Sequence, residues 1–159
     1  MKMERHFLLI VVCSVSLFSC TNLDVYEKTI PLPDQKWSYQ LNPNFTFSIS
    51  DTTSAYNIFL VVRHTDAYKY NNLWLKADIK PPGDSTKTQN VDLTLANDQK
   101  GWMGKGMDDI FEYRKNITPG PVPFKKVGEY TITLSQIMRE NPLDHLMNIG
   151  VRIEKVRLN

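Results

Sequence analysis

The chain contains very little cysteine: Cys13 and Cys20 are the only two among its 159 residues. A disulfide framework and a cysteine-rich zinc site both need several cysteines at recurring spacings, so the sequence excludes them. We therefore expect a domain that folds on its hydrophobic core alone, without a disulfide, a metal or another cofactor.

An excess of charge of one sign is also missing. The sequence has 19 Lys and Arg against 17 Asp and Glu, a formal net charge of +2, and no block of like charges. A balanced chain has no electrostatic reason to bind nucleic acid, and we expect no nucleic-acid partner. Beyond the first twenty residues there is no apolar run long enough to span a membrane, no low-complexity tract and no internal repeat.

Motifs that carry catalysis are absent as well. The chain has no G-x-S-x-G turn that would place a nucleophile beside a base. The glycine-rich stretch 101–106 (GWMGKG) does not match a phosphate-binding loop: only two residues separate Gly101 from the Gly-Lys pair, and glycine follows Lys105. We expect a protein that is not an enzyme and has no small-molecule substrate.

Histidine and acidic side chains are present, but their spacing does not fit a metal site. His64 and Asp66 could coordinate a metal from an extended segment, yet His145 is the only later histidine and zinc needs three or four ligands. Three acidic side chains within 108–112 could coordinate calcium, although they lack the spacing of an EF-hand loop. The sequence predicts no metal site and leaves the calcium alternative open.

The N-terminus shows a pattern typical of a signal peptide. Lys2 and Arg5 precede a stretch from Phe7 to Phe18 that is apolar apart from Cys13 and two serines. About twelve apolar residues are too few to span a hydrocarbon core of ~30 Å, whereas they suit the central part of a signal peptide. We predict a lipoprotein signal peptide over residues 1–19.

The end of that stretch, Leu17-Phe18-Ser19-Cys20, resembles the bacterial lipobox, in which the cysteine receives diacylglycerol. Lipid attachment at Cys20 would also explain a lone cysteine in an exported chain, and several acyl chains would hold the protein on a membrane. We therefore expect a lipidated tether over residues 20–36. The alternative is an ordinary signal peptide cleaved nearby, with Cys20 an incidental thiol.

From residue 37 the chain alternates between apolar and polar residues, with Pro, Gly and Asn at the turns. A continuous apolar run over 56–62 predicts a central strand buried on both faces, and residues 135–140 could form one helical turn. We predict an all-β fold: a single antiparallel β-sandwich, jelly-roll or immunoglobulin-like, of about eight strands over residues 37–159. The alternating segments are 37–41, 45–49, 73–79, 91–95, 128–134 and 147–158.

The stretch RHTDAYKYNNLWLK (63–76) is the most polar-aromatic part of the chain and connects two predicted strands. We expect Trp74 to be buried and to anchor the sandwich, while other residues line an end loop near the glycine turn at 104–106. The structural alternative is that its Asp and Asn residues cap turns while Tyr68 and Tyr70 lie on the sheet. The candidate interaction surface comprises Arg63, Asp66, Tyr70, Asn72, Trp102, Lys105 and Asp108.

Three segments, in order after the lipobox, resemble the gliding-motility lipoprotein family GldH of Bacteroidota. They are RHTDAYKYNNLWL (63–75), GKGMDDIFEYR (104–114) and ENPLDHLMNIGVRIEK (140–155). The resemblance implies an envelope lipoprotein, anchored in the outer membrane and facing the periplasm, that is required for gliding motility and tied to the type IX secretion machinery. It implies no catalytic activity, and it assigns a role to Cys20 alone.

Two classes of function remain open. The first is a non-catalytic, membrane-anchored lipoprotein that supports the motility or secretion machinery through contacts with envelope proteins. The second is a carbohydrate- or peptidoglycan-binding module, because β-sandwiches with Trp and Tyr in their end loops can stack on sugars. A row of exposed coplanar aromatic rings would favour the sugar, and a polar-aromatic patch with Arg63 or Arg114 would favour a protein partner.

Overall fold

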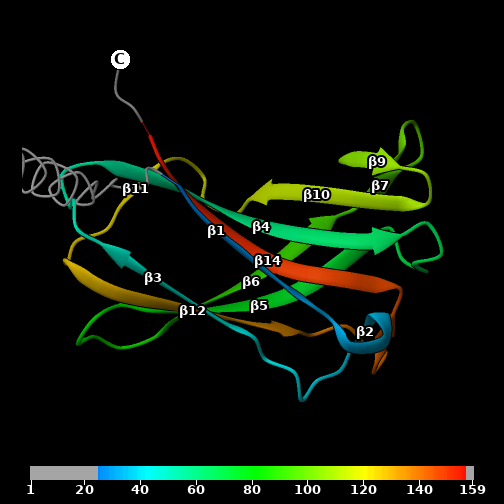
Figure 1. Cartoon of the computed structure of the whole chain (residues 1–159), viewed down its shortest axis with the longest axis horizontal. Helices are drawn as coiled ribbons and strands as arrows, with labels where there is room; N and C mark the ends of the chain where they lie inside the picture. Colours follow the sequence, from blue (N-terminus) through cyan, green and yellow to red (C-terminus); the bar gives the residue numbers. More distant parts are fainter. Residues whose placement is uncertain (1–24, 157–159) are drawn as a thin grey trace, which may run out of the picture.

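A computed structural model describes residues 25–156 of the chain (Figure 1). The predicted signal peptide and Cys20 lie outside these residues. The described part is all-β apart from one short 3-10 turn, η2 (Pro33–Gln35), which confirms the predicted fold class. Within residues 25–156, no helix is both long and apolar enough to cross a membrane.

Two antiparallel sheets make up the fold. The larger runs in the order β1 (Val25–Pro31), β14 (Leu146–Lys155), β4 (Ala55–Thr65), β10 (Ile110–Asn116), β9 (Lys105–Met107), and β11 (Val122–Pro123) also pairs with β4. The smaller runs β3 (Asn44–Ile49), β12 (Gly128–Gln136), β5 (Asn72–Lys80), β6 (Lys87–Thr94). Two short ladders join β2 (Lys36–Trp37) to β13 (Leu143–Asp144) and β7 (Ala96–Asn97) to β8 (Gly101–Trp102).

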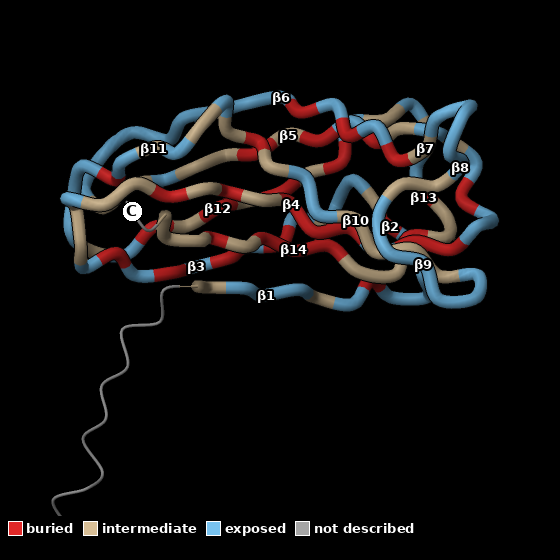
Figure 2. The backbone as a smooth tube through the Cα atoms, turned by 90° about the horizontal axis from the view of Figure 1, so that it is seen from above, coloured by how far each residue is buried: buried red, intermediate tan, exposed pale blue. Residues whose placement is uncertain are grey.

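The hydrophobic core lies between the two sheets. Alternate residues of β3, β4, β5, β12 and β14 contribute to one contiguous cluster, so buried positions alternate with more exposed ones along most of these strands (Figure 2). β3 reads exposed-buried from Asn44 to Ile49, because residues two apart face the same side of a sheet. The fully buried members include Phe45, Leu60, Leu75, Leu93, Ile132 and Leu134.

The long strands confirm the pattern predicted from the sequence. β4 is a central strand, paired with β14 on one side and with β10 and β11 on the other, and its residues Leu60, Val61 and Val62 are all buried. The strand count is larger than predicted, at fourteen in the described residues. Eight of these have six or more residues and six have only two or three, too short to leave an alternating pattern.

Residues 25–31, the later part of the expected tether, form the edge strand β1 and pair with 148–154, because Tyr26 and Ile30 pack against the core. Two local expectations differ from the structure. Of the predicted strand 37–41, only Trp37 is in a strand. The helical turn expected over 135–140 is wrong: β12 runs to Gln136, where its pairing with β5 continues to Leu75.

Candidate interaction groove

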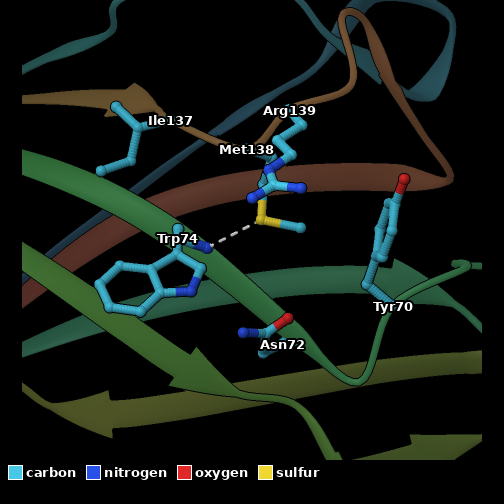
Figure 3. A pocket seen from close by; sticks show the side chains of 6 residues that line it. All are labelled: Tyr70, Asn72, Trp74, Ile137, Met138 and Arg139. Carbon is cyan, nitrogen blue, oxygen red and sulfur yellow. Dashed lines mark hydrogen bonds between the residues drawn. The ribbon is translucent and has the colours of Figure 1, made fainter.

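A groove of about 470 Å³ opens at one end of the smaller sheet, where β5 begins and β12 ends (Figure 3). The pairing of Leu75 with Gln136 places the residues that follow β12 directly beside Trp74. Two hydrogen bonds fix this arrangement, from Ile137 N to Trp74 O at 3.0 Å and from Trp74 N to Met138 Sδ at 3.2 Å. We call this groove the Trp74 groove. It is lined by Tyr70, Asn72, Trp74, Ile137, Met138 and Arg139.

The expectation that Trp74 is a buried anchor is wrong, because its side chain is 42% exposed. The two-residue period of β5 puts Leu73, Leu75 and Ala77 on the core side, where all three are fully buried. Trp74 therefore shares the outer face with Lys76 and Asp78. This signal was present in the sequence, since the alternation of 73–79 assigns Trp74 to the polar face.

Tyr70 forms the opposite wall of the groove and is held in place by a charged loop. Its hydroxyl donates to Glu140 Oε2 at 2.5 Å, and Lys69 Nζ lies 2.9 Å from Glu140 Oε1. The bond from Tyr70, followed by that from Lys69, lowers the pKa of the Glu140 carboxyl. The same bond to Glu140 raises the pKa of Tyr70. At neutral pH, Tyr70 is therefore a neutral phenol that donates to the carboxylate of Glu140.

Ile137, Met138 and Arg139 form the third wall of the groove, and hydrogen bonds also fix their backbone. Buried Gln136 accepts a bond from Met138 N at 2.9 Å through its carbonyl oxygen and donates to Glu140 O at 3.2 Å. Tyr39 donates from its hydroxyl to Met138 O at 2.5 Å. The groove is therefore formed before any ligand arrives, which reduces the entropy that binding would cost.

Two side chains of this wall, those of Ile137 and Arg139, face solvent. Ile137 is 41% exposed, and Arg139 is exposed and makes no ion pair within residues 25–156. The groove thus offers an indole, a phenol, an amide, the side chains of Ile137 and Met138, and the cation of Arg139, which has no ion pair in the described part of the chain. Such an arrangement can bind an apolar group together with an anion.

The structure divides the seven predicted surface residues between two places. Tyr70 and Asn72 line the Trp74 groove, where Asn72 Nδ2 donates to Asp92 Oδ1 of β6 at 2.9 Å; Asn72 bridges two strands and does not cap a turn. The other five lie on or beside the β9–β10 hairpin. Sequence reasoning missed Ile137, Met138 and Arg139, which lie within the segment wrongly predicted as a helical turn.

Four of these five residues are exposed, Trp102 is half-buried, and the group is partly ion-paired. Arg63 Nη2 lies 2.6 Å from Glu112 Oε2, and Asp66 donates from its backbone N to Asp109 O at 2.8 Å. Asp108, at the hairpin tip, has a positive φ of 55°, and Lys105 pairs with Glu112 in the ladder. Of the three residues expected near the glycine turn, Asp66 lies beside this hairpin, whereas Tyr70 and Asn72 line the Trp74 groove.

The calcium alternative at 108–112 finds no converging ligands. Glu112 is paired through Oε2 with Arg63 and through Oε1 with Arg114, at 2.6 and 3.0 Å, so both of its oxygens are engaged. Within residues 25–156, no group of three or more His, Cys, Asp or Glu side chains is placed to hold a metal ion.

A row of aromatic rings connects the groove to the hairpin. Tyr68 is buried and has its ring centroid 5.8 Å from that of Tyr70, and half-buried Trp102 lies 6.4 Å from Tyr68. His64 follows at 4.5 Å from Trp102 and 5.8 Å from Phe111. Tyr68 was expected on the sheet surface, but it belongs to the core.

His64 is the most enclosed polar group of this row. Its side chain is fully buried, its Nδ1 donates to Thr65 O at 2.8 Å, and its Nε2 has no hydrogen-bond partner among the described residues. Burial lowers the pKa of His64 below its ordinary value, because a charged imidazole that is removed from water loses its hydration. The ring is therefore neutral at neutral pH.

Residues 24–153 match the sequence model of the GldH lipoprotein family. The chain belongs to the GldH lipoprotein family. The predicted resemblance is thereby confirmed over nearly the whole sequence, and it places the chain among membrane-anchored lipoproteins of the cell envelope.

Two curated relatives are similar along their full length. A "Gliding motility lipoprotein GldH homolog" of Christiangramia forsetii is 28% identical, over 92% of this chain and 93% of its own. The "Gliding motility lipoprotein GldH" of Flavobacterium johnsoniae is 29% identical, over 92% of this chain and 94% of its own. Among solved structures, a subviral particle of infectious bursal disease virus VP2 has a TM-score of only 0.39 at 16% identity, over 84% of this chain and 33% of that one.

Proposed function

We propose that this protein supports gliding motility and its type IX secretion machinery by binding another envelope protein, without catalysing a reaction. In this proposal it is anchored by lipid at Cys20 to the outer membrane and faces the periplasm. The observation that supports a protein partner is the composition of the Trp74 groove. Trp, Tyr, Met and Arg are enriched in protein interfaces, Lys, Glu and Asp are depleted, and the six lining residues follow both trends.

The groove suits binding better than chemistry. The hydroxyl of Tyr70 already donates to Glu140, and the side-chain amide of Asn72 already donates to Asp92. The guanidinium of Arg139 carries hydrogen-bond donors and no acceptor. No acid–base pair is therefore available among the lining residues, which supports the assignment of a non-catalytic role.

A deletion strain tests this function directly. In a gliding relative, removing the gene should abolish colony spreading and lower the amount of protein that the type IX machinery secretes into the medium, and the intact chain should restore both. Complementation with Ile137→Ser should fail at normal protein level, while Val127→Ser should succeed. Val127 is the matched control because it is 64% exposed and precedes β12, whereas Ile137 follows the same strand. Normal spreading and secretion in the deletion strain would refute the proposal.

A carbohydrate- or peptidoglycan-binding function is the second candidate, and the exposed indole of Trp74 is the observation that favours it. Sugars stack on such faces, but they also need many hydrogen-bonding groups around the ring. Figure 3 shows Tyr70 and Trp74 on opposite sides of Met138, not side by side in a row. Titration with a hexamer of N-acetylglucosamine, followed through the indole N–H signal of Trp74, distinguishes this function from the first.

A further inference from the structure

We infer that the Trp74 groove binds a segment of a partner protein in which a carboxylate lies close to a large apolar side chain. The inference rests on the proposed function, since it names the chemistry of the partner at the same site. The apolar side chain would lie between Trp74 and Tyr70 over Met138, and the carboxylate would pair with Arg139.

The charge of the groove supports the carboxylate. Lys69 beside the groove is neutralised by Glu140 at 2.9 Å, and Lys76 on β5 by Asp78 at 3.1 Å. Arg139 is therefore the one lining cation, and within residues 25–156 it has no anionic partner. A guanidinium beside apolar walls binds a carboxylate through two parallel hydrogen bonds, a geometry that also fixes its orientation.

The walls support an apolar side chain next to that carboxylate. Trp74 and Ile137 are 42% and 41% exposed, which is unusual for large apolar residues placed side by side on a sheet face that is otherwise polar. The neighbouring outward positions on β5 and β12 are occupied by Lys76, Asp78, Thr133 and Ser135. A partner side chain would remove this apolar surface from water.

The hydrogen-bonding groups of the groove argue against a sugar at this site. A sugar exposes hydroxyls on every edge, and each hydroxyl removed from water needs a new partner. The Tyr70 hydroxyl proton and one Asn72 N–H already bond Glu140 and Asp92, and the side chains of Ile137 and Met138 offer no donor, so the donors left for a sugar are few and come mainly from Trp74 and Arg139. A protein segment with one anion and one apolar group makes fewer such demands.

Photo-cross-linking in living cells tests the inference on the full chain. A photoreactive phenylalanine analogue at position 137 should form an adduct with a partner, and the same analogue at position 127 should not. Arg139→Glu should reduce the adduct at position 137 about tenfold, because it places two negative charges together. Lys125→Glu, an exposed lysine near Val127 at the other end of β12, should leave it unchanged.

The chemistry of the adduct decides the outcome. Mass spectrometry should place the cross-link within a segment that holds Asp, Glu or a C-terminal carboxylate, and changing that group to Lys should restore the adduct of Arg139→Glu. A cross-link that tolerates Arg139→Glu, a segment without a carboxylate or the absence of an adduct at position 137 would overturn the inference. So would a shift of the Trp74 indole signal with the N-acetylglucosamine hexamer.

The two proposals fail in different ways. If the deletion strain spreads and secretes normally, the proposed function is wrong whatever the groove binds. If the deletion has its phenotype but Arg139→Glu has no effect on the adduct, the function stands and the inferred partner chemistry is wrong.

Discussion

Arg114 on β10 reaches across the larger sheet to Glu27 on β1, with Nη2 and Oε1 2.7 Å apart. Two strands, β4 and β14, lie between them in the sheet order. Glu27 also binds Arg152 of β14 at 2.7 Å, and Arg114 also contacts Glu112 at 3.0 Å. Partial burial pushes the pKa of Glu27 up, but the bonds from Arg114 and Arg152 outweigh it and lower the pKa.

Replacing Glu27 by Gln should therefore destabilise the attachment of β1. We expect a loss of about 1 kcal/mol in the free energy of unfolding at low salt, because the pairs are near the surface, and a smaller loss at high salt. Urea unfolding at two salt concentrations measures both values. Glu129→Gln is the control: Glu129 is exposed on β12 and should give almost no change. Equal losses at both salt concentrations would contradict an ionic origin.

Gly150 controls how closely β1 approaches β14. A Cβ at this position would collide with the carbonyl oxygen of Lys28 and lie 2.8 Å from Thr29 Cα, both in the backbone of β1. Gly150→Ala should lower the free energy of unfolding by about 1–3 kcal/mol, because the backbone of β1 cannot move aside as easily as a flexible side chain. The amides of β1 should then exchange faster with solvent. Gly120→Ala, where nothing lies within 4 Å of the added Cβ, should be neutral.

The long strands of this fold could be predicted because their alternation is local. Phe45, Phe47 and Ile49, or Tyr130, Ile132 and Leu134, reveal the buried face without knowledge of the neighbouring strand. β10 could not be recognised in this way, because five of its seven residues are half-buried and the other two exposed, so no apolar period remains. Its position depends on pairing with β4, a contact distant in sequence.

The site was only partly predictable for the same reason. Tyr70 and Asn72 were recognised from the polar-aromatic stretch, but the third wall comes from residues more than sixty positions later. The pairing of Leu75 with Gln136 alone decides that Ile137 and Arg139 lie beside Trp74. The exposure of Trp74 was predictable from the alternation of β5, whereas the lack of an ion pair for Arg139 among residues 25–156 depends on the folded chain.

The buried His64 predicts a stability that depends on pH. Its pKa is lowered in the folded protein, so between the ordinary value near 6.5 and the lowered value the unfolded chain binds more protons. The free energy of unfolding should therefore fall as the pH drops from about 7.5 through that window. Thermal unfolding across the range measures the effect.

A variant that cannot titrate isolates this contribution. His64→Phe keeps a ring among Trp102, Tyr68 and Phe111 and should flatten the pH profile between about 7 and 5. His145→Asn changes an incompletely buried histidine at a positive φ of 66°, which asparagine tolerates, and should keep the slope. An unchanged slope in His64→Phe would assign the pH dependence to other groups.

Lipid attachment at Cys20 remains a prediction, because this residue lies outside the described part of the chain. Cys20→Ser should move the protein from the membrane fraction to the soluble fraction and abolish labelling with palmitate, since the thioether cannot form. Cys13→Ser should leave both unchanged, because it alters the signal peptide only at one small residue. Membrane association that survives Cys20→Ser would disprove the lipid anchor at this position.

The last prediction compares the tryptophan that supports the fold with the one that lines the groove. Trp37 is fully buried and its Nε1 donates to Leu41 O at 2.8 Å, where β2 pairs with β13. Trp37→Ala should cost about 3–5 kcal/mol, because it leaves a cavity and an unpaired carbonyl. Trp74→Ala should cost about 1 kcal/mol or less, because much of its ring already contacts water.

Urea unfolding of the two variants, together with the cross-linking yield at position 137, separates stability from binding. Trp74→Ala should retain a cooperative transition near that of the parent protein and still lose the adduct, because one wall of the groove is gone. Phenylalanine at position 74 should recover part of the adduct by restoring an aromatic face. If Trp74→Ala loses as much stability as Trp37→Ala, Trp74 supports the fold from its exposed position. The cross-linking yields of the groove variants would then have to be compared at equal amounts of folded protein.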